Sequence, residues 1–125
     1  MANLKHWRTL LLLCVFLQGN HSNSIQRPRY IDCQDSNECA GGSCCVMGMG
    51  RFSIPTCKTH QEQNEPCHAG QTQPVNTTVI YLDGAVVDYT NVFVQYCHCA
   101  VGLACDELTS TCQDPLSNPN FNFLN

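Results

Sequence analysis

Basic residues are absent from the second half of the chain. No Lys or Arg follows Lys58, whereas the same stretch holds seven acidic residues: Glu62, Glu65, Asp83, Asp88, Asp106, Glu107 and Asp114. A surface with only negative charges repels nucleic acids, heparin-like chains and anionic membranes, which are therefore poor partners. A basic receptor surface is compatible with it. The simpler alternative is that the acidic residues only keep a small protein soluble.

Motifs of catalysis and of metal binding are also missing. The chain contains no G-x-S-x-G, H-E-x-x-H, Gly-rich phosphate loop or EF-hand pattern, and no paired C-x-x-C spacing of a structural zinc site. His60, His68 and His98 are the candidate general bases, but they accompany no recognisable nucleophile motif. Glu62 and Glu65 lie three apart in a polar stretch, which indicates a solvated pair rather than an acid–base dyad. We therefore expect no enzyme, no cofactor and no bound metal.

A membrane-spanning run is missing as well, because the one long apolar run is too short. Residues 9–17 form an uncharged run of about nine residues behind a basic stretch, as in a signal peptide, whereas a spanning helix needs about 20. The alternative, an N-terminal helix packed on a core, lacks a matching helical face later in the chain. We predict a signal peptide over residues 1–19, cleaved after Gly19 or Ser22, and a secreted protein without membrane insertion. Loss of the two basic residues of this segment changes the net charge from −4 to about −6.

The cysteine count agrees with export. Of 11 cysteines, Cys14 lies in the signal peptide, which leaves ten: Cys33, Cys39, Cys44, Cys45, Cys57, Cys67, Cys97, Cys99, Cys105 and Cys112. An even number in a short exported chain indicates five disulfides, but spacing alone leaves their connectivity open. The adjacent Cys44 and Cys45 rarely bond each other and should send bonds in two directions. Because few long apolar side chains lie between residues 33 and 67, the core is thin, and each disulfide should add about 2–4 kcal/mol.

Composition divides the mature chain into three parts. Residues 20–32 are polar and lack periodicity, which predicts a flexible N-terminal arm. Residues 33–112 contain every cysteine of the mature chain and form one domain, and residues 113–125 form a tail. Within the domain, the cysteine-free residues 68–96 separate two cysteine-dense units.

The middle of the chain carries the clearest strand pattern. Residues 75–82 are rich in strand formers, Asp83-Gly84 is a two-residue hairpin signal, and residues 85–89 can return as the partner strand. A third strand is predicted over residues 92–96. The apolar residues here are expected in the core, and the alternative is an exposed apolar fingertip that contacts a receptor. The fold class is therefore small, disulfide-rich and mainly β.

Two N-x-[ST] sequons occur in the chain. The sequon at Asn76 lies at the edge of the predicted hairpin, and in a secreted protein it makes Asn76 a candidate for N-glycosylation. A glycan there would mark a solvent-facing edge. The second sequon, at Asn20, lies at the predicted cleavage site.

The order of the ten cysteines is itself a motif. It includes Cys39-Ala40-Gly41-Gly42-Ser43-Cys44-Cys45-Val46, Cys67-His68-Ala69-Gly70, Cys97-His98-Cys99, Val101-Gly102-Leu103-Ala104-Cys105 and Cys112, before a tail with Asn120-Phe121-Asn122-Phe123. From Cys33 to the C-terminus this order resembles the prokineticins and their invertebrate relatives, the astakines. The broader shape is shared with colipase and the C-terminal domain of dickkopf proteins. The resemblance implies a compact body with β-hairpin fingers.

A disulfide pairing is also implied by the resemblance. Carried over by cysteine order, it joins Cys33–Cys45, Cys39–Cys57, Cys44–Cys97, Cys67–Cys105 and Cys99–Cys112. Of these, Cys44–Cys97 closes the longest loop and should contribute most to stability on the chain-entropy model.

The residues before Cys33 distinguish the two branches of this resemblance. Prokineticins carry Ala-Val-Ile-Thr-Gly-Ala directly before the first cysteine, and receptor activation depends on it. This chain has Arg27-Pro28-Arg29-Tyr30-Ile31-Asp32 instead, and it is acidic where vertebrate prokineticins are basic. The resemblance to astakines therefore implies a cytokine or growth factor that promotes blood-cell proliferation and differentiation through a cell-surface receptor.

Other functions fit the same scaffold. One is a toxin or defence polypeptide, and another is a colipase-like lipase partner, whose fingertips should carry a clustered apolar patch. For a receptor, exposure alone points to Arg51, Phe52, Asp83 and Gly84 as contacts. We expect the protein to act as a monomer.

Overall fold

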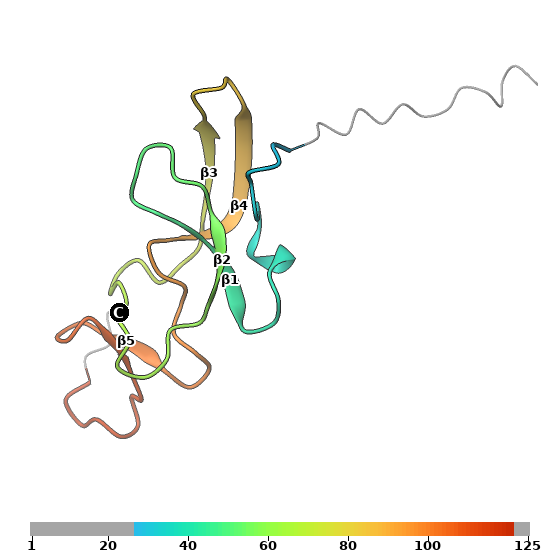
Figure 1. Ribbon diagram of the computed structural model, residues 1–125. Helices are drawn as coiled ribbons and strands as arrows, with labels where there is room; N and C mark the ends of the chain where they lie inside the picture. The colour runs from blue at the N-terminus through green and yellow to red at the C-terminus, as the bar shows by residue number, and fades with distance from the viewer. Residues whose placement is uncertain (1–26, 122–125) are drawn as a thin grey trace, which may run out of the picture.

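Residues 27–121 are described by the computed structural model, which places two β-sheets one after the other along an elongated body (Figure 1). The predicted signal peptide over residues 1–19, with Cys14, and the sequon at Asn20 lie outside the described residues, as does the end of the predicted tail. Within the described range, no helix is long and apolar enough to cross a membrane. The mainly β, disulfide-rich architecture confirms the predicted fold class.

A four-stranded sheet forms the larger part of the fold. Its strands are β1 (Ser43–Met47), β2 (Thr56–Thr59), β3 (Val75–Ile80) and β4 (Val86–Val94), in the spatial order β2-β1-β4-β3. β1 pairs antiparallel with β2 and parallel with β4, and β4 pairs antiparallel with β3. The smaller sheet consists of β5 (Ala104–Asp106) and β6 (Thr111–Gln113), and a short 3-10 helix, η1 (Ser36–Glu38), precedes β1.

The β3–β4 hairpin confirms the predicted hairpin, although its turn is longer than the two residues expected. The Tyr81 N–H donates to Ala85 O (2.9 Å) and the Gly84 N–H donates to Tyr81 O (2.9 Å), so Leu82 and Asp83 are the central turn residues. Gly84 follows them at φ 83°. This is a three-residue loop whose last position must be left-handed, and glycine adopts that conformation without steric cost.

The prediction of a separate strand over residues 92–96 is wrong. β4 runs without interruption to Val94 and pairs first with β3 and then, near its end, with β1. Asn91 lies inside it at φ 53°. Asparagine tolerates this left-handed conformation better than most residues, so the chain bends there without leaving the sheet.

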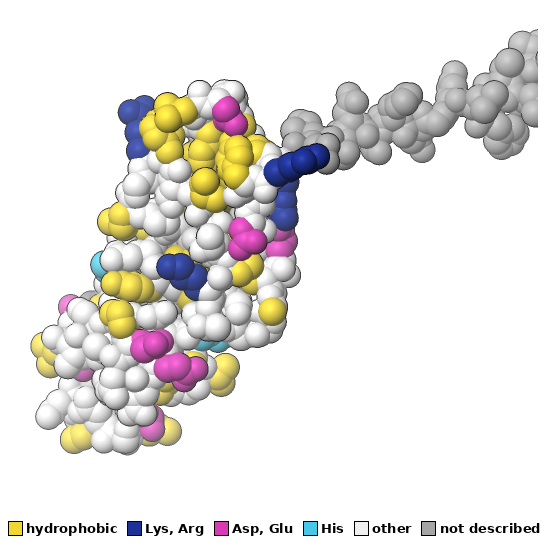
Figure 2. All heavy atoms as spheres, in the orientation of Figure 1, with side chains coloured by type: hydrophobic (Ala, Val, Ile, Leu, Met, Phe, Trp, Pro, Cys, Tyr) yellow, Lys and Arg dark blue, Asp and Glu magenta, His cyan; other side chains and the backbone are white. Residues whose placement is uncertain are grey.

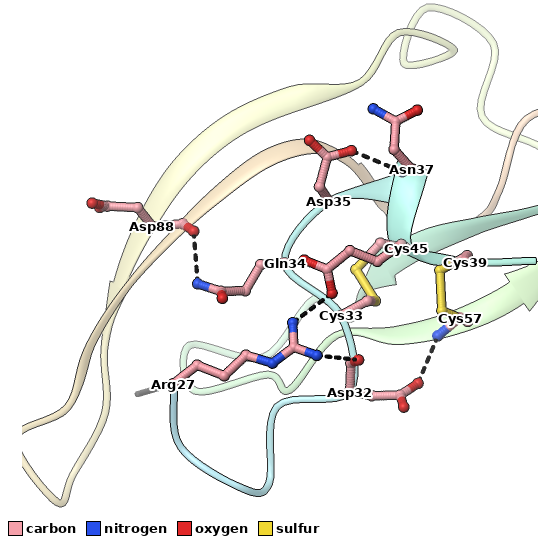
Figure 3. Close-up of polar contacts among 11 residues, drawn as sticks. Arg27, Asp32, Cys33, Gln34, Asp35, Asn37, Cys39, Cys45, Cys57 and Asp88 are labelled. Atoms are coloured by element: carbon pink, nitrogen blue, oxygen red, sulfur yellow. Dashed lines mark hydrogen bonds and ion pairs between the residues drawn. A yellow bond between two sulfur atoms is a disulfide. The ribbon is translucent and has the colours of Figure 1, made fainter. Parts of the chain in front are cut away.

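Residues 27–32 are attached to the sheet, which corrects the prediction of a flexible arm for this part of the segment. Ile31 is 4% exposed and packs in the larger core cluster. Arg27 forms an ion pair with Glu38. As Figure 3 shows, the Asp32 carboxylate accepts a hydrogen bond from the backbone N–H of Cys57 in β2 (3.1 Å). One buried side chain beside a disulfide is enough to fix a segment whose composition is otherwise polar.

Two core clusters lie on the two faces of β1. On one face Cys45 and Met47 pack with Ile31, Cys33, Tyr81, Val87, Tyr89 and Val92, and on the other Cys44 and Val46 pack with Phe93 and Cys97. Successive side chains of a strand point to opposite faces of the sheet. The adjacent cysteines therefore bond in opposite directions, Cys44 to Cys97 and Cys45 to Cys33.

Five disulfides join the described cysteines. The pairs are Cys33–Cys45, Cys39–Cys57, Cys44–Cys97, Cys67–Cys105 and Cys99–Cys112. These are the pairs that the family resemblance implies, and peptide mapping of the oxidised protein is their direct test.

The smaller sheet belongs to a second unit, defined here as residues 62–67 and 97–121, so that Gln61 still counts with the larger sheet. Two disulfides lie inside this unit, and its backbone pairs with the end of the larger sheet through a bridge between Gln61 and Cys99. The Cys44–Cys97 disulfide connects the two units covalently. The molecule thus consists of two small units, each containing disulfides, that are joined at one place.

Candidate functional site

The free end of the β3–β4 hairpin exposes apolar side chains. Ile80 and Val86 are direct cross-strand partners, and they are 64% and 60% exposed. Leu82, at the turn between them, is 85% exposed. Exposed apolar groups of this size on a small protein mark an interaction surface when they are contiguous.

Strand alternation explains why these residues face water. Tyr81 is 7% exposed and lies in the larger core cluster, so its neighbours Ile80 and Leu82 point away from that core. The exposed fractions of Ile80, Leu82 and Val86 show that no described element covers this face of the hairpin. The hairpin therefore buries one face and leaves an apolar tip on the other.

The loop between β1 and β2 adds a second apolar group at the same end. Phe52 and Ile54 are 39% and 44% exposed, and Ser53 between them accepts a hydrogen bond at its backbone O from the Tyr81 hydroxyl (2.9 Å). A carbonyl oxygen only accepts hydrogen bonds, so the Tyr81 hydroxyl is the donor to Ser53 O. The Tyr89 hydroxyl must therefore donate to the Tyr81 hydroxyl oxygen (2.6 Å). This buried chain of hydrogen bonds holds the loop against the hairpin.

We call the exposed set the apolar tip. It consists of Phe52, Ile54, Ile80, Leu82 and Val86. Figure 2 shows hydrophobic side chains gathered at this end of the molecule, over the hairpin and the neighbouring loop.

Polar groups fix the shape of the turn inside the tip. The Asp83 carboxylate accepts hydrogen bonds from Ala85 N–H (3.0 Å) and from the Tyr30 hydroxyl (2.8 Å), and these bonds lower the pKa of Asp83. Loss of hydration first, and the bond to Asp83 second, raise the pKa of Tyr30 to about 12. The Tyr30 ring also packs edge-on against Tyr81 at a centroid distance of 5.5 Å. The turn is therefore held by contacts on both its sides before any partner binds.

The four residues expected to contact a receptor all lie at this end. Asp83 and Gly84 are in the hairpin turn, and Arg51 and Phe52 are in the β1–β2 loop that the Tyr81 bond attaches to it. The Arg51 guanidinium lies 5.4 Å from the centroid of the Phe52 ring. The structure thus brings together two pairs that are distant in sequence, whereas whether they contact a receptor stays a prediction.

Sequence reasoning did not name the aliphatic members of the tip. The apolar strand pattern favours the core for Ile80, Leu82 and Val86, with an exposed apolar fingertip as the alternative, and their exposure agrees with that alternative. The available signal was Leu82 directly before Asp83-Gly84, since a side chain at a hairpin turn has little sheet to cover it.

Charge is distributed unevenly along the molecule. The second unit carries five acidic residues and no Lys or Arg: Glu62, Glu65, Asp106, Glu107 and Asp114. Figure 2 shows acidic side chains over the end that carries β5, and basic side chains nearer the apolar tip. The two ends therefore differ in charge, and the second unit also exposes single apolar side chains such as Val101 and Leu116.

The described residues offer no set of three metal ligands. Three clusters of Cys and His atoms lie close together, but every cysteine in them is in a disulfide and has no thiolate to donate. In the cluster of His60, Cys97 and His98, only the two imidazoles are left as metal ligands. A hollow of about 450 Å³ lies beside His98, lined by small residues such as Ala69 and Ala104.

Comparison with known proteins gives two relatives. The chain is 36% identical to astakine of Penaeus monodon over 84 residues, which cover 67% of this chain and 67% of that protein. It is 29% identical to U3-aranetoxin-Ce1a of Caerostris extrusa over 77 residues, which cover 61% of this chain and 60% of that protein. No family model and no solved structure matches the chain.

Proposed function

Because the chain belongs to the astakine family, we propose that it is a secreted cytokine that acts on blood-cell precursors through a cell-surface receptor. The similarity to astakine is the observation that carries this proposal. Two further features support it. A core that depends on five disulfides is typical of proteins of the extracellular space, and the segment at residues 1–19 has the pattern of a signal peptide.

The apolar tip is the receptor contact in this proposal. Binding sites draw most of their energy from a few apolar or aromatic side chains that become fully buried, surrounded by polar groups that exclude water. Leu82, Ile80 and Val86 supply such anchors, and Arg51 and Asp83 lie at their rim. Because the turn is already held by Tyr30 and Tyr81, little conformational entropy is lost when a receptor covers it.

The proposal is tested by adding the oxidised protein to cultured haemocyte precursors and counting dividing cells over a wide range of concentrations. A dose-dependent rise in proliferation is expected, and protein that has been reduced and alkylated should have no effect. The absence of any response to the folded protein would contradict a cytokine role.

A toxin is the second candidate, favoured by the similarity to U3-aranetoxin-Ce1a. The two candidates differ in the tissue that makes the protein and in the effect of injection. Expression confined to a venom gland, with paralysis of injected arthropods and no proliferation, would replace the cytokine proposal.

We further propose that Asn76 carries an N-linked glycan. Asn76 is exposed on the edge strand β3, at the point where its register with β4 shifts. Its amide oxygen accepts a hydrogen bond from Asn91 N–H (2.9 Å), and this leaves the amide nitrogen, the atom that is glycosylated, directed elsewhere. The strand edge would then be shielded from pairing with other chains.

Expression in insect cells should give a protein whose mass falls on treatment with peptide N-glycosidase. Asn76→Gln should abolish this shift, and so should Thr78→Ala, which removes the hydroxyl of the sequon. A protein of unchanged mass after treatment would show that the site is not used.

A further inference from the structure

Two histidines lie ring against ring where the sheet and the second unit meet. His60 directly follows β2, and His98 lies between Cys97 and Cys99 in the second unit. Their ring centroids are 4.0 Å apart with a tilt of 43°, and both side chains are half-buried. The His98 ring also packs at 5.2 Å on Phe93 of the smaller core cluster.

The backbone beside this pair makes the non-covalent join between the two units. The Gln61 N–H donates to His98 O (3.0 Å), and the Ala100 N–H donates to Gln61 O (2.9 Å). Anything that separates the two rings therefore acts on these two hydrogen bonds. The disulfide Cys44–Cys97 passes through the same place and keeps the units attached when the hydrogen bonds open.

The contacts fix the tautomer of one ring and disfavour charge on the other. His98 Nδ1 lies 2.9 Å from Cys99 O, and because a carbonyl oxygen only accepts, the neutral ring keeps its proton at Nδ1. Burial first, and the neighbouring His98 second, lower the pKa of His60, while the Glu62 carboxylate acts in the opposite direction. Two imidazolium rings at this distance would repel each other.

Few other charged groups face the pair. Lys58 precedes His60 by two residues on β2 and so lies on the same side of that strand. His68 shares a small hollow with His98, but its own ring packs on Tyr96. On the sheet side, the β4 ring that packs on His98 is the uncharged Phe93.

We propose that the His60–His98 pair is an acid-sensitive contact, which holds the second unit on the sheet near pH 7.5 and releases it near pH 5 while the disulfides preserve the covalent frame. The sign follows from proton linkage. A base whose pKa is lower in the folded than in the unfolded chain contributes stability that is complete above the unfolded value of about 6.5. That contribution is lost as the pH falls below 6.5. Such a contact would respond to uptake of the protein into an acidic compartment.

Amide hydrogen exchange, read by NMR and corrected for the intrinsic effect of pH, tests this contact. Between pH 7.5 and pH 5.0, protection of the Gln61 and Ala100 amides should fall by well over about twofold, because protonation of the half-buried His60 ring weakens the contact. His60→Gln removes the half-buried titrating ring and should reduce this fall to less than about twofold, whereas His98→Gln removes the smaller cause and should reduce it only in part. His68→Gln leaves the pair intact and should behave like the wild type.

The imidazole signals give a second readout that does not depend on variants. The His60 titration midpoint should lie below 6.5 in the wild type and rise in His98→Gln. A midpoint at or above 6.5, or an equal loss of protection in His60→Gln, would overturn the proposal. No receptor is needed for either measurement, so the result is independent of the cytokine proposal.

Discussion

Replacing Cys44 and Cys97 with alanine is expected to lower the free energy of unfolding by about 4 kcal/mol, the largest effect of any single disulfide in the protein. The bond joins residues separated by 53 positions, and the chain-entropy model gives about 4 kcal/mol for a loop of this length. Both side chains are almost fully buried in the smaller core cluster, so the lost packing adds to this value. Urea unfolding under non-reducing conditions measures the change.

The matched control is the double variant Cys99→Ala and Cys112→Ala. That bond closes a loop of 13 positions within the second unit, for which the same model gives about 3 kcal/mol. If the two double variants lose equal stability, loop length does not determine how much each disulfide contributes to the free energy of unfolding. The contribution of the Cys44–Cys97 bond then has an origin other than the constraint on the unfolded chain.

Leu82→Asp is expected to reduce the potency of the protein on haemocyte precursors by about 30-fold or more. This corresponds to the loss of a binding hot spot of about 2 kcal/mol. Leu82 is 85% exposed and makes no core contact, so the substitution should leave the midpoint of unfolding unchanged. The loss of potency then reports on binding rather than on folding.

Leu116→Asp is the control because it makes the same chemical change at a side chain that is 96% exposed and far from the apolar tip. It should retain potency within about twofold. An equal loss of potency in both variants would show that the change in net charge causes the loss, and not the change in the apolar tip. If Leu82→Asp retains its potency, the proposal that the apolar tip contacts the receptor is wrong.

The apolar tip also meets the condition expected of a colipase-like lipase partner, a clustered apolar patch at the fingertips. Sedimentation with neutral phospholipid vesicles distinguishes this function from receptor binding. Wild-type protein that stays in the supernatant, while still active on cells, is the result that a receptor contact predicts.

The sequence could predict the hairpin and the number of disulfides because both depend on local signals. Asp83-Gly84 between two runs of strand formers specifies a turn whatever surrounds it. The parallel pairing of β1 with β4 has no such signal, since it joins Val46 to Phe93, residues far apart in the sequence, and depends on what the Cys44–Cys97 bond brings together. The continuity of β4 through Asn91 was missed for a related reason, because a residue that usually ends a strand here only bends it.

The turn and loop members of the candidate site were predictable, whereas its aliphatic strand members were not. Asp83 and Arg51 are charged residues next to turn residues, and such residues are exposed in almost any fold. Which face of a β-hairpin is buried depends on which strand lies beside it, and this is a tertiary property. Ile80 and Tyr81 are neighbours with similar strand propensity, yet one is 64% exposed and the other 7%.

The adjacent cysteines on opposite faces of β1 have a consequence for the fidelity of oxidation. An isomer in which Cys44 and Cys45 exchange partners differs from the native protein by two bonds between the same four sulfur atoms. To form it, β1 would have to turn over, which moves Val46 and Met47 each into the core built for the other. The packing of the two cores thus favours the native disulfide isomer over the isomer with exchanged partners, although both contain the same number of disulfides. During disulfide exchange, β1 therefore destabilises the mispaired isomer.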